Sequence, residues 1–198
     1  MTATLLRPAN ALGSISIIDP ATPLKRREGS QKRGLAARSA SLDGKVLAII
    51  DNQMGSAPIL AEALLARLKE TYRLADVIWV KKPSVSVPPR PEDWAEVTLR
   101  ADVGLALFGG CGSCTSRAVR DAIEMEWSGI PSVAVVHDAL MGSANAIRKM
   151  SGMANYPVVT VGYPAAPTSV WTGEQLATVV ETIYGQVIER LTSITAAK

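Results

Sequence analysis

The two cysteines of the chain are separated by two residues within a glycine-rich segment. Cys111 and Cys114 lie in residues 109–116, Gly-Gly-Cys-Gly-Ser-Cys-Thr-Ser, which join an apolar run to a segment with helical periodicity. A thiol at a helix N-terminus ionises more easily, because the helix dipole stabilises the thiolate. In a Cys-x-x-Cys pair one thiolate can attack a substrate, and the other can resolve the adduct by forming a disulfide. The spacing predicts thiol redox chemistry with both cysteines as catalytic residues.

The residues around the cysteines are candidates for holding a substrate. Three glycines in four residues allow backbone conformations that are closed to other residues, and they leave N–H groups uncovered for an anion. Thr115 or Ser116 is the expected N-cap of the following helix. A phosphate-binding loop is disfavoured, because no Gly-Lys-Ser/Thr follows and the glycine spacing differs from the dinucleotide motif. The candidate substrate-binding residues here are Gly110, Gly112, Ser113, Thr115 and Ser116. The purely structural alternative is a tight turn with two small buried cysteines.

Other polar residues follow the remaining apolar runs. His137, the single histidine, is a candidate general base or acid toward Cys111. Asp51 and Asn52, which follow the first run, are candidates for binding a substrate amine or amide. Lys82 and Ser84, which follow the second run, are candidates for holding a substrate carboxylate. Turn and solvated-loop roles remain open for all four.

A metal centre is an alternative use of the same cysteines. Cys111, Cys114 and His137 offer two sulfur ligands and one nitrogen ligand, with a fourth position left for water, as in catalytic zinc sites. A single Cys-x-x-Cys is a weak zinc signal, so the first expectation has no metal and no cofactor. A third possibility is a non-catalytic subunit of a larger complex.

The elements that position these residues alternate in type. Five short apolar runs are separated by segments with helical periodicity, the last of them from Glu174 to Ile194. The runs are Lys45–Ile50, Asp76–Val80, Asp102–Phe108, Ser132–Val136 and Pro157–Val161. This alternation predicts an α/β fold with a doubly wound, flavodoxin-like, five-stranded parallel sheet in the order 2-1-3-4-5 and an N-terminal extension. Ligands bind such sheets at the carboxyl ends of the strands, which places the cysteine segment at the expected site.

Composition and charge restrict the class of protein and its partners. The chain has 198 residues, 47% hydrophobic and 20% charged, which is typical of a globular domain. No apolar run is long enough to span a membrane. The first 20 residues lack the pattern of a secretory signal, so the expected location is the cytoplasm.

The basic residues are concentrated at the N-terminus. Residues 1–40 form a predicted basic arm, and residues 41–198 form a single domain. The arm lacks interleaved aromatic residues, so nucleic acid is a disfavoured partner. Ile15, Ile17 and Ile18 form a short apolar patch that we expect to pack on a second subunit, with the stretch from Lys25 to Arg38 lying across it. The expected partners are a small-molecule substrate and a second copy of the chain or another subunit.

The segment 109–116, together with residues 117–124 and 129–135, resembles the UGSC family. That family is named for selenocysteine-Gly-Ser-Cys, and many members have cysteine at the first position. It is distantly similar to selenoprotein B of glycine and betaine reductases. The resemblance covers roughly residues 42–164 and implies thiol or selenol redox chemistry, without indicating a substrate. We expect a thiol-dependent enzyme that acts on a small polar substrate by reductive or lyase-type cleavage. The resemblance also implies that Cys111, at the selenocysteine position, is the nucleophile and that Cys114 is the resolving thiol.

Overall fold

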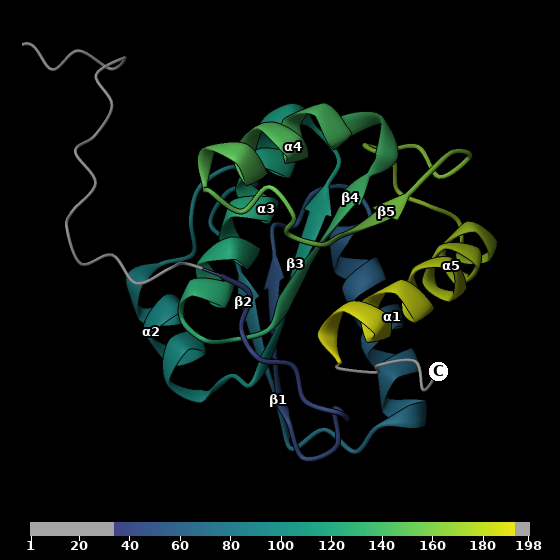
Figure 1. Ribbon diagram of the computed structural model, residues 1–198. Coiled ribbons are helices and arrows are strands. Elements are labelled where there is room, and N and C mark those ends of the chain that lie inside the picture. Colours follow the sequence, from purple (N-terminus) through teal and green to yellow (C-terminus); the bar gives the residue numbers. More distant parts are fainter. Residues whose placement is uncertain (1–33, 193–198) are drawn as a thin grey trace, which may run out of the picture. The chain divides into compact units, whose positions relative to one another are not determined.

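The sheet has five parallel strands in the order β2-β1-β3-β4-β5. The computed structural model of the chain (Figure 1) describes residues 34–192. The strands are β1 (Val46–Asp51), β2 (Asp76–Lys81), β3 (Val103–Gly109), β4 (Ser132–His137) and β5 (Val158–Val161). This order confirms the predicted doubly wound sheet. The apolar patch at Ile15, Ile17 and Ile18 lies outside the described residues.

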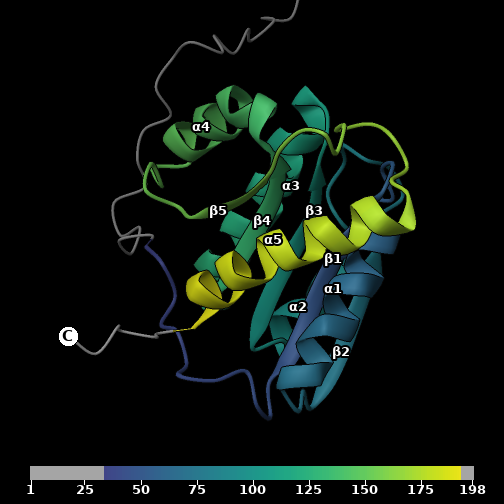
Figure 2. The same cartoon turned by 90° about the vertical axis from the view of Figure 1, so that its right-hand side faces the viewer.

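Helices cover both faces of the sheet, as Figures 1 and 2 show. Two helices, α1 (Ala57–Thr71) and α5 (Gly173–Leu191), pack on one face. The other face carries α2 (Pro91–Arg100), α3 (Gly112–Trp127) and α4 (Met141–Met150), the last preceded by a short 3₁₀ turn, η1 (Asp138–Leu140). No helix in the described part of the chain is long and apolar enough to cross a membrane.

The two-sided burial follows from the strand sequences. Alternate residues of a strand point to opposite faces. In β1, Leu47 and Ile49 pack with α1 and α5, whereas Ala48 and Ile50 pack with the helices opposite. All seven residues of β3 are buried, as expected for a central strand of a covered parallel sheet. Because β3 is fixed on both faces, the segment that leaves its carboxyl end starts from a rigid position.

A buried carboxylate at the end of the sheet where the strands begin binds the last residues of the predicted arm. Glu126, near the end of α3, accepts hydrogen bonds from the main-chain N–H of Ala36 (2.6 Å) and from the Arg38 guanidinium (2.6 and 2.9 Å). Arg38 also donates to the carbonyl of Arg190 (3.0 Å), and Ser39 pairs with Thr192. Arg38, which we expected to lie across a partner subunit, is therefore bound to its own domain.

Candidate active site

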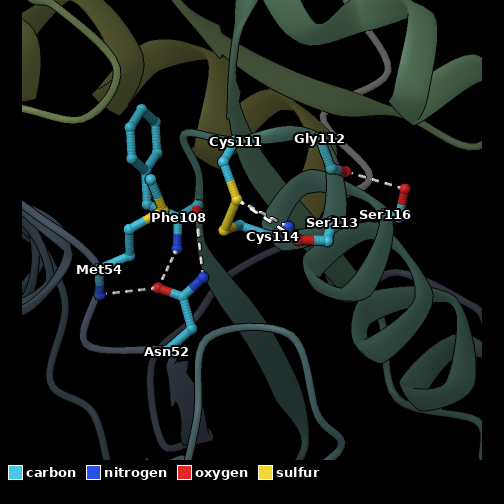
Figure 3. The surroundings of a disulfide bond; sticks show 8 residues. All are labelled: Asn52, Met54, Phe108, Cys111, Gly112, Ser113, Cys114 and Ser116. Atoms are coloured by element: carbon cyan, nitrogen blue, oxygen red, sulfur yellow. Dashed lines mark hydrogen bonds between the residues drawn. A yellow bond between two sulfur atoms is a disulfide. The ribbon is translucent and has the colours of Figure 1, made fainter.

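The cysteine pair lies at the junction of β3 and α3 (Figure 3). Cys111 and Cys114 form a disulfide, with their Cα atoms 5.1 Å apart. Cys111 is partly exposed, whereas the side chain of Cys114 is buried, with 1% of its surface accessible. The two sulfurs thus reach bonding distance from positions three residues apart in one turn. Cys111 is the cysteine that a reagent in solution meets first.

Cys111 is the N-cap of α3. Its Sγ accepts a hydrogen bond from the main-chain N–H of Cys114 (3.2 Å), and the Ser113 hydroxyl lies 3.6 Å from the same sulfur. The expected N-cap at Thr115 or Ser116 is wrong, because the N-cap is Cys111, four or five residues earlier. Thr115 N–H already donates to the carbonyl of Cys111, and the Ser116 hydroxyl donates to the carbonyl of Gly112. The earlier start places the positive end of the helix dipole directly at Cys111.

The glycines before the helix are required by close packing rather than by unusual dihedral angles. None of Gly109, Gly110 and Gly112 has a positive φ, so the segment does not use the conformations that only glycine allows. A Cβ on Gly110 would lie 2.1 Å from the carbonyl oxygen of Pro167, and one on Gly109 would lie 2.7 Å from the Val136 side chain. Gly112 is exposed, and its nearest neighbour would be Ser143, at 3.7 Å. The first two glycines therefore let other backbone and side chains approach the cysteine segment closely.

Replacement of Gly110 by alanine is expected to lower the free energy of unfolding by about 1–3 kcal/mol, the usual cost of overpacking. The clash is with backbone, which cannot turn aside as a side chain can. Urea denaturation of Gly110→Ala measures the effect. Gly142→Ala is the matched control, since a Cβ there meets nothing within 4 Å and alanine favours the helix. Equal stability of Gly110→Ala and the wild type would contradict the packing argument.

The loop between β5 and α5 forms a wall beside the cysteine segment. Besides the contact of Pro167 with Gly110, the Ser56 hydroxyl donates to the carbonyl of Ser169 (2.9 Å) and accepts from the N–H of Trp171 (2.8 Å). The Trp171 ring packs edge-on against Phe108, with ring centroids 5.4 Å apart. None of the site residues predicted from the sequence lies in this loop. Its position after the carboxyl end of a strand was the available signal, because all such ends share one edge of the sheet.

Asn52 is occupied by the main chain at the end of β3. Its Nδ2 donates to the carbonyl of Phe108 (2.9 Å), and its Oδ1 accepts from the N–H groups of Phe108 (3.1 Å) and Met54 (3.2 Å) (Figure 3). Asn52 is 2% exposed. The predicted role in binding a substrate amine or amide is not supported, because the carboxamide instead fixes the residue from which the cysteine segment departs.

Asp51 is likewise directed into the protein. Its Oδ1 accepts from the N–H of Gln53 (2.7 Å), and this turn holds Gln53 at a φ of 59°. The side chain is fully buried, and burial raises the pKa of Asp51. Asp51 therefore shapes the loop after β1 and does not present a carboxylate to a ligand.

Lys82 forms a buried ion pair instead of holding a substrate carboxylate. Its Nζ lies 2.7 Å from Oδ2 of Asp121 on α3, and both side chains are 1% exposed. The other oxygen of Asp121 accepts from Arg117 (2.7 Å), which also pairs with Glu124 (2.6 Å). Burial lowers the pKa of Lys82 and raises that of Asp121, and each partner opposes the shift of the other.

The remaining members of this group are also accounted for. Arg117 on α3 is occupied by Asp121 and Glu124, so it does not serve as a counter-charge to a thiolate. Ser84 is exposed on the loop after β2, and it has no contact with the cysteine segment among the interactions found in residues 34–192.

His137 is fully buried, and main-chain groups occupy both nitrogens of its ring. Nε2 lies 3.1 Å from the carbonyl oxygen of Ala165, which can only accept, so Nε2 is the donor in this hydrogen bond. Nδ1 accepts from the N–H of Ala139 (3.2 Å), and Asp138 Oδ1 lies 3.0 Å away. The predicted acid–base role toward Cys111 is therefore not supported, and the ring instead anchors the β5–α5 loop to the end of β4.

The described part of the chain holds no cluster of three or more His, Cys, Asp or Glu side chains that is arranged to bind a metal. Cys111, Cys114 and His137 thus do not assemble the zinc-like site that we considered as an alternative. The two sulfurs are bonded to each other, and the imidazole is held by main-chain groups.

Comparison with known proteins identifies a family. No curated protein and no solved structure matches the chain. A model of the UGSC family matches residues 16–193, a range that includes every described strand and helix and both cysteines. The match begins within the predicted basic arm, so part of that arm is a feature of the family. Because the matched range is most of the sequence, the chain belongs to the UGSC family.

Proposed function

We propose that the protein is a thiol-dependent enzyme that reduces a small polar substrate at the Cys111–Cys114 pair. The observation that carries the proposal is the asymmetry of the pair. Cys111 is partly exposed and caps α3, whereas Cys114 is buried behind it at bonding distance. This arrangement suits an attacking thiol that meets the substrate and a resolving thiol that does not.

The reaction begins with the reduced pair. The Cys111 thiolate attacks the electrophilic atom E of a substrate E–L, forming a Cys111–S–E bond and releasing L with the bonding electrons. The Cys114 thiolate then attacks Cys111 Sγ, which closes the disulfide and releases E with the electrons of the S–E bond. E and L each take one proton, so E–L and two thiols yield E–H, L–H and one disulfide. An external dithiol returns the enzyme to its reduced form.

Activation of Cys111 relies on the helix terminus. Reduced Cys111 Sγ retains the Cys114 N–H and the Ser113 hydroxyl as donors, and it lies at the positive end of α3. His137 and Arg117 are occupied elsewhere, so the thiol loses its proton to solvent rather than to a side-chain base. The N–H groups of Gly112 and Ser113, in the first turn of α3, are available to a substrate anion. Free thiols persist in a reducing compartment, so we place the activity in the cytoplasm.

The thiolate should be detectable by alkylation. We expect reduced Cys111 to react with iodoacetamide with an apparent pKa below about 8.5, the value of a free thiol. The measurement is the alkylation rate as a function of pH, with the modified residue identified by mass spectrometry. Ser113→Ala is the matched variant, and it should raise the apparent pKa because one donor to the sulfur is lost. A wild-type value at or above that of a free thiol would remove the basis of the mechanism.

A model electrophile tests the complete reaction. Reduced protein mixed with bis(2-hydroxyethyl) disulfide should release both halves of the reagent as thiol and end as the intramolecular disulfide. Cys111→Ser should lose this reaction, because its remaining thiol is buried. If Cys111→Ser reacts as fast as the wild type, the roles of the two cysteines are reversed.

A further inference from the structure

A cavity lies apart from the cysteine segment. It has a volume of about 480 Å³ and lies between the start of the β5–α5 loop and the first half of α5. Residues 161–165 form one wall, and residues of α5 between Glu174 and Ile183 form the other. None of residues 109–116 lines it. The volume is in the range of cavities that bind small molecules.

The cavity has an apolar base and one charged group. Val161, Val179 and Ile183 are buried residues of the core that line it, and Tyr163, which is 69% exposed and whose ring is in T-shaped contact with His137, lines it as well. Glu174 is the only ionisable acid or base among the lining residues apart from the Tyr163 phenol. Within residues 34–192, the Glu174 carboxylate takes part in none of the ion pairs or side-chain hydrogen bonds. Apart from the positive end of the α5 dipole, where it lies, the carboxylate therefore has no counter-charge among the described residues.

The hydroxyl groups of the α5 wall are oriented as acceptors. Thr178 donates its hydroxyl hydrogen to the carbonyl of Glu174 (3.0 Å), and Thr182 donates to the carbonyl of Thr178 (2.8 Å). Each hydroxyl has one hydrogen, so the oxygens have only lone pairs left to offer a ligand. The capping box of Thr172 and Gln175 also occupies two N–H groups at the start of α5. The remaining first-turn N–H groups of α5 lie beside the Glu174 carboxylate, whose charge repels an anion.

We infer that this cavity binds a small organic ammonium ion. The ammonium group pairs with Glu174 and donates to the hydroxyl oxygens of Thr178 or Thr182. The Tyr163 ring adds an attraction between the cation and its π face. The hydrocarbon part of the ligand covers Val161, Val179 and Ile183. This inference does not rest on the proposed thiol chemistry, because no cysteine lines the cavity.

Titration of the full chain with n-hexylammonium and with 1-hexanol tests the charge requirement. The disulfide form is used, so that the cysteines do not react. We expect the ammonium ion to bind about threefold to fivefold more tightly than the alcohol, the gain of a solvent-accessible ion pair. Calorimetry measures the affinities, and methyl NMR shifts at Val179 and Ile183 locate the ligand. Equal affinity for both probes, tighter binding of hexanoate, or absence of methyl shifts at saturating probe overturns the inference.

Two variants separate the carboxylate from general effects of charge. Glu174→Gln should reduce the affinity for n-hexylammonium to that for 1-hexanol. Glu189→Gln makes the same change of charge on the same helix, outside the cavity, and should leave binding unchanged. Thr178→Val, which removes one acceptor and keeps the side-chain shape, should weaken ammonium binding but not alcohol binding. An unchanged affinity of Glu174→Gln for n-hexylammonium overturns the assignment of the ligand class.

Discussion

Replacement of Cys114 by serine is expected to stop the reaction of Cys111 after its first step. Reduced Cys114→Ser protein, mixed with excess bis(2-hydroxyethyl) disulfide, should release one equivalent of thiol and keep the other half of the reagent on Cys111. Wild-type protein should release both equivalents and retain no adduct. The difference arises because only Cys114 Sγ is within bonding distance of Cys111 Sγ. Released thiol and intact protein mass measure the two outcomes.

Two further variants make this result specific. Cys111→Ser should retain little reagent, because Cys114 is 1% exposed. Ser128→Ala changes a hydroxyl at the other end of α3 that donates to the Glu124 carbonyl and leaves both thiols in place, so it should behave as the wild type. An adduct found on Cys114 in the wild type, or release of both thiol equivalents by Cys114→Ser, would refute the assignment of nucleophile and resolving thiol.

Replacement of Asp121 by alanine should lower the free energy of unfolding by about 3–5 kcal/mol at neutral pH, the usual cost of breaking a buried ion pair from one side. Asp121 is the acceptor of Lys82 Nζ in the described structure, so the variant leaves a buried ammonium group without a counter-charge. Arg117 loses only one of its carboxylate partners in this variant, because Glu124 still accepts a hydrogen bond from it. Urea denaturation measures the change.

The same variant should show a distinctive pH dependence. Burial already lowers the pKa of Lys82 in the wild type, and removal of the carboxylate lowers it further in the folded state. Between the folded and unfolded pKa values, the unfolded chain binds more protons, so the stability of the variant rises with pH. The difference in free energy of unfolding between the wild type and Asp121→Ala should therefore become smaller as the pH increases from 7 toward 10.

Two control variants separate the effect of burying the ion pair from the effect of the ion pair itself on stability. Asp121→Asn keeps an oxygen for Lys82 and should lose less stability than Asp121→Ala. Asp76→Ala breaks an exposed pair with Arg100 and should change stability by no more than about 1 kcal/mol. If Asp121→Ala proves no worse than Asp76→Ala at pH 7, the buried pair does not stabilise the fold in the way described.

The sheet could be predicted from the sequence because its signal is local. Each strand is a short apolar run bounded by polar residues, and each helix has its own periodicity, so the alternation alone specifies a parallel doubly wound sheet. The location of the Cys-x-x-Cys segment after the third strand followed from the same pattern. These expectations needed no knowledge of which residues, distant in the sequence, touch each other.

The partners of the polar residues could not be predicted in this way. Lys82 follows a strand and resembles a loop lysine, and only its contact with Asp121, 39 positions away, buries it. His137 and Asn52 form hydrogen bonds with main-chain groups. Every residue has such groups, so the sequence does not indicate which of them a side chain will bind. The glycines were assigned to unusual dihedral angles because that need is local, whereas the requirement of Gly110 comes from Pro167. Burial of a polar residue depends on contacts that periodicity does not record.

The wall formed by the β5–α5 loop has a consequence for the order in which the chain folds. Its contacts join residues distant in sequence: Ser56 to Ser169 across 113 positions, His137 to Ala165 across 28, and Gly110 to Pro167. Such long-range contacts form late, because closing a long loop costs entropy before the contact is gained. During synthesis from the N-terminus, the cysteine segment leaves the ribosome before the loop that packs against Gly110. The newly made protein therefore passes through a stage in which both cysteines are present without the loop that holds the end of β3 in place.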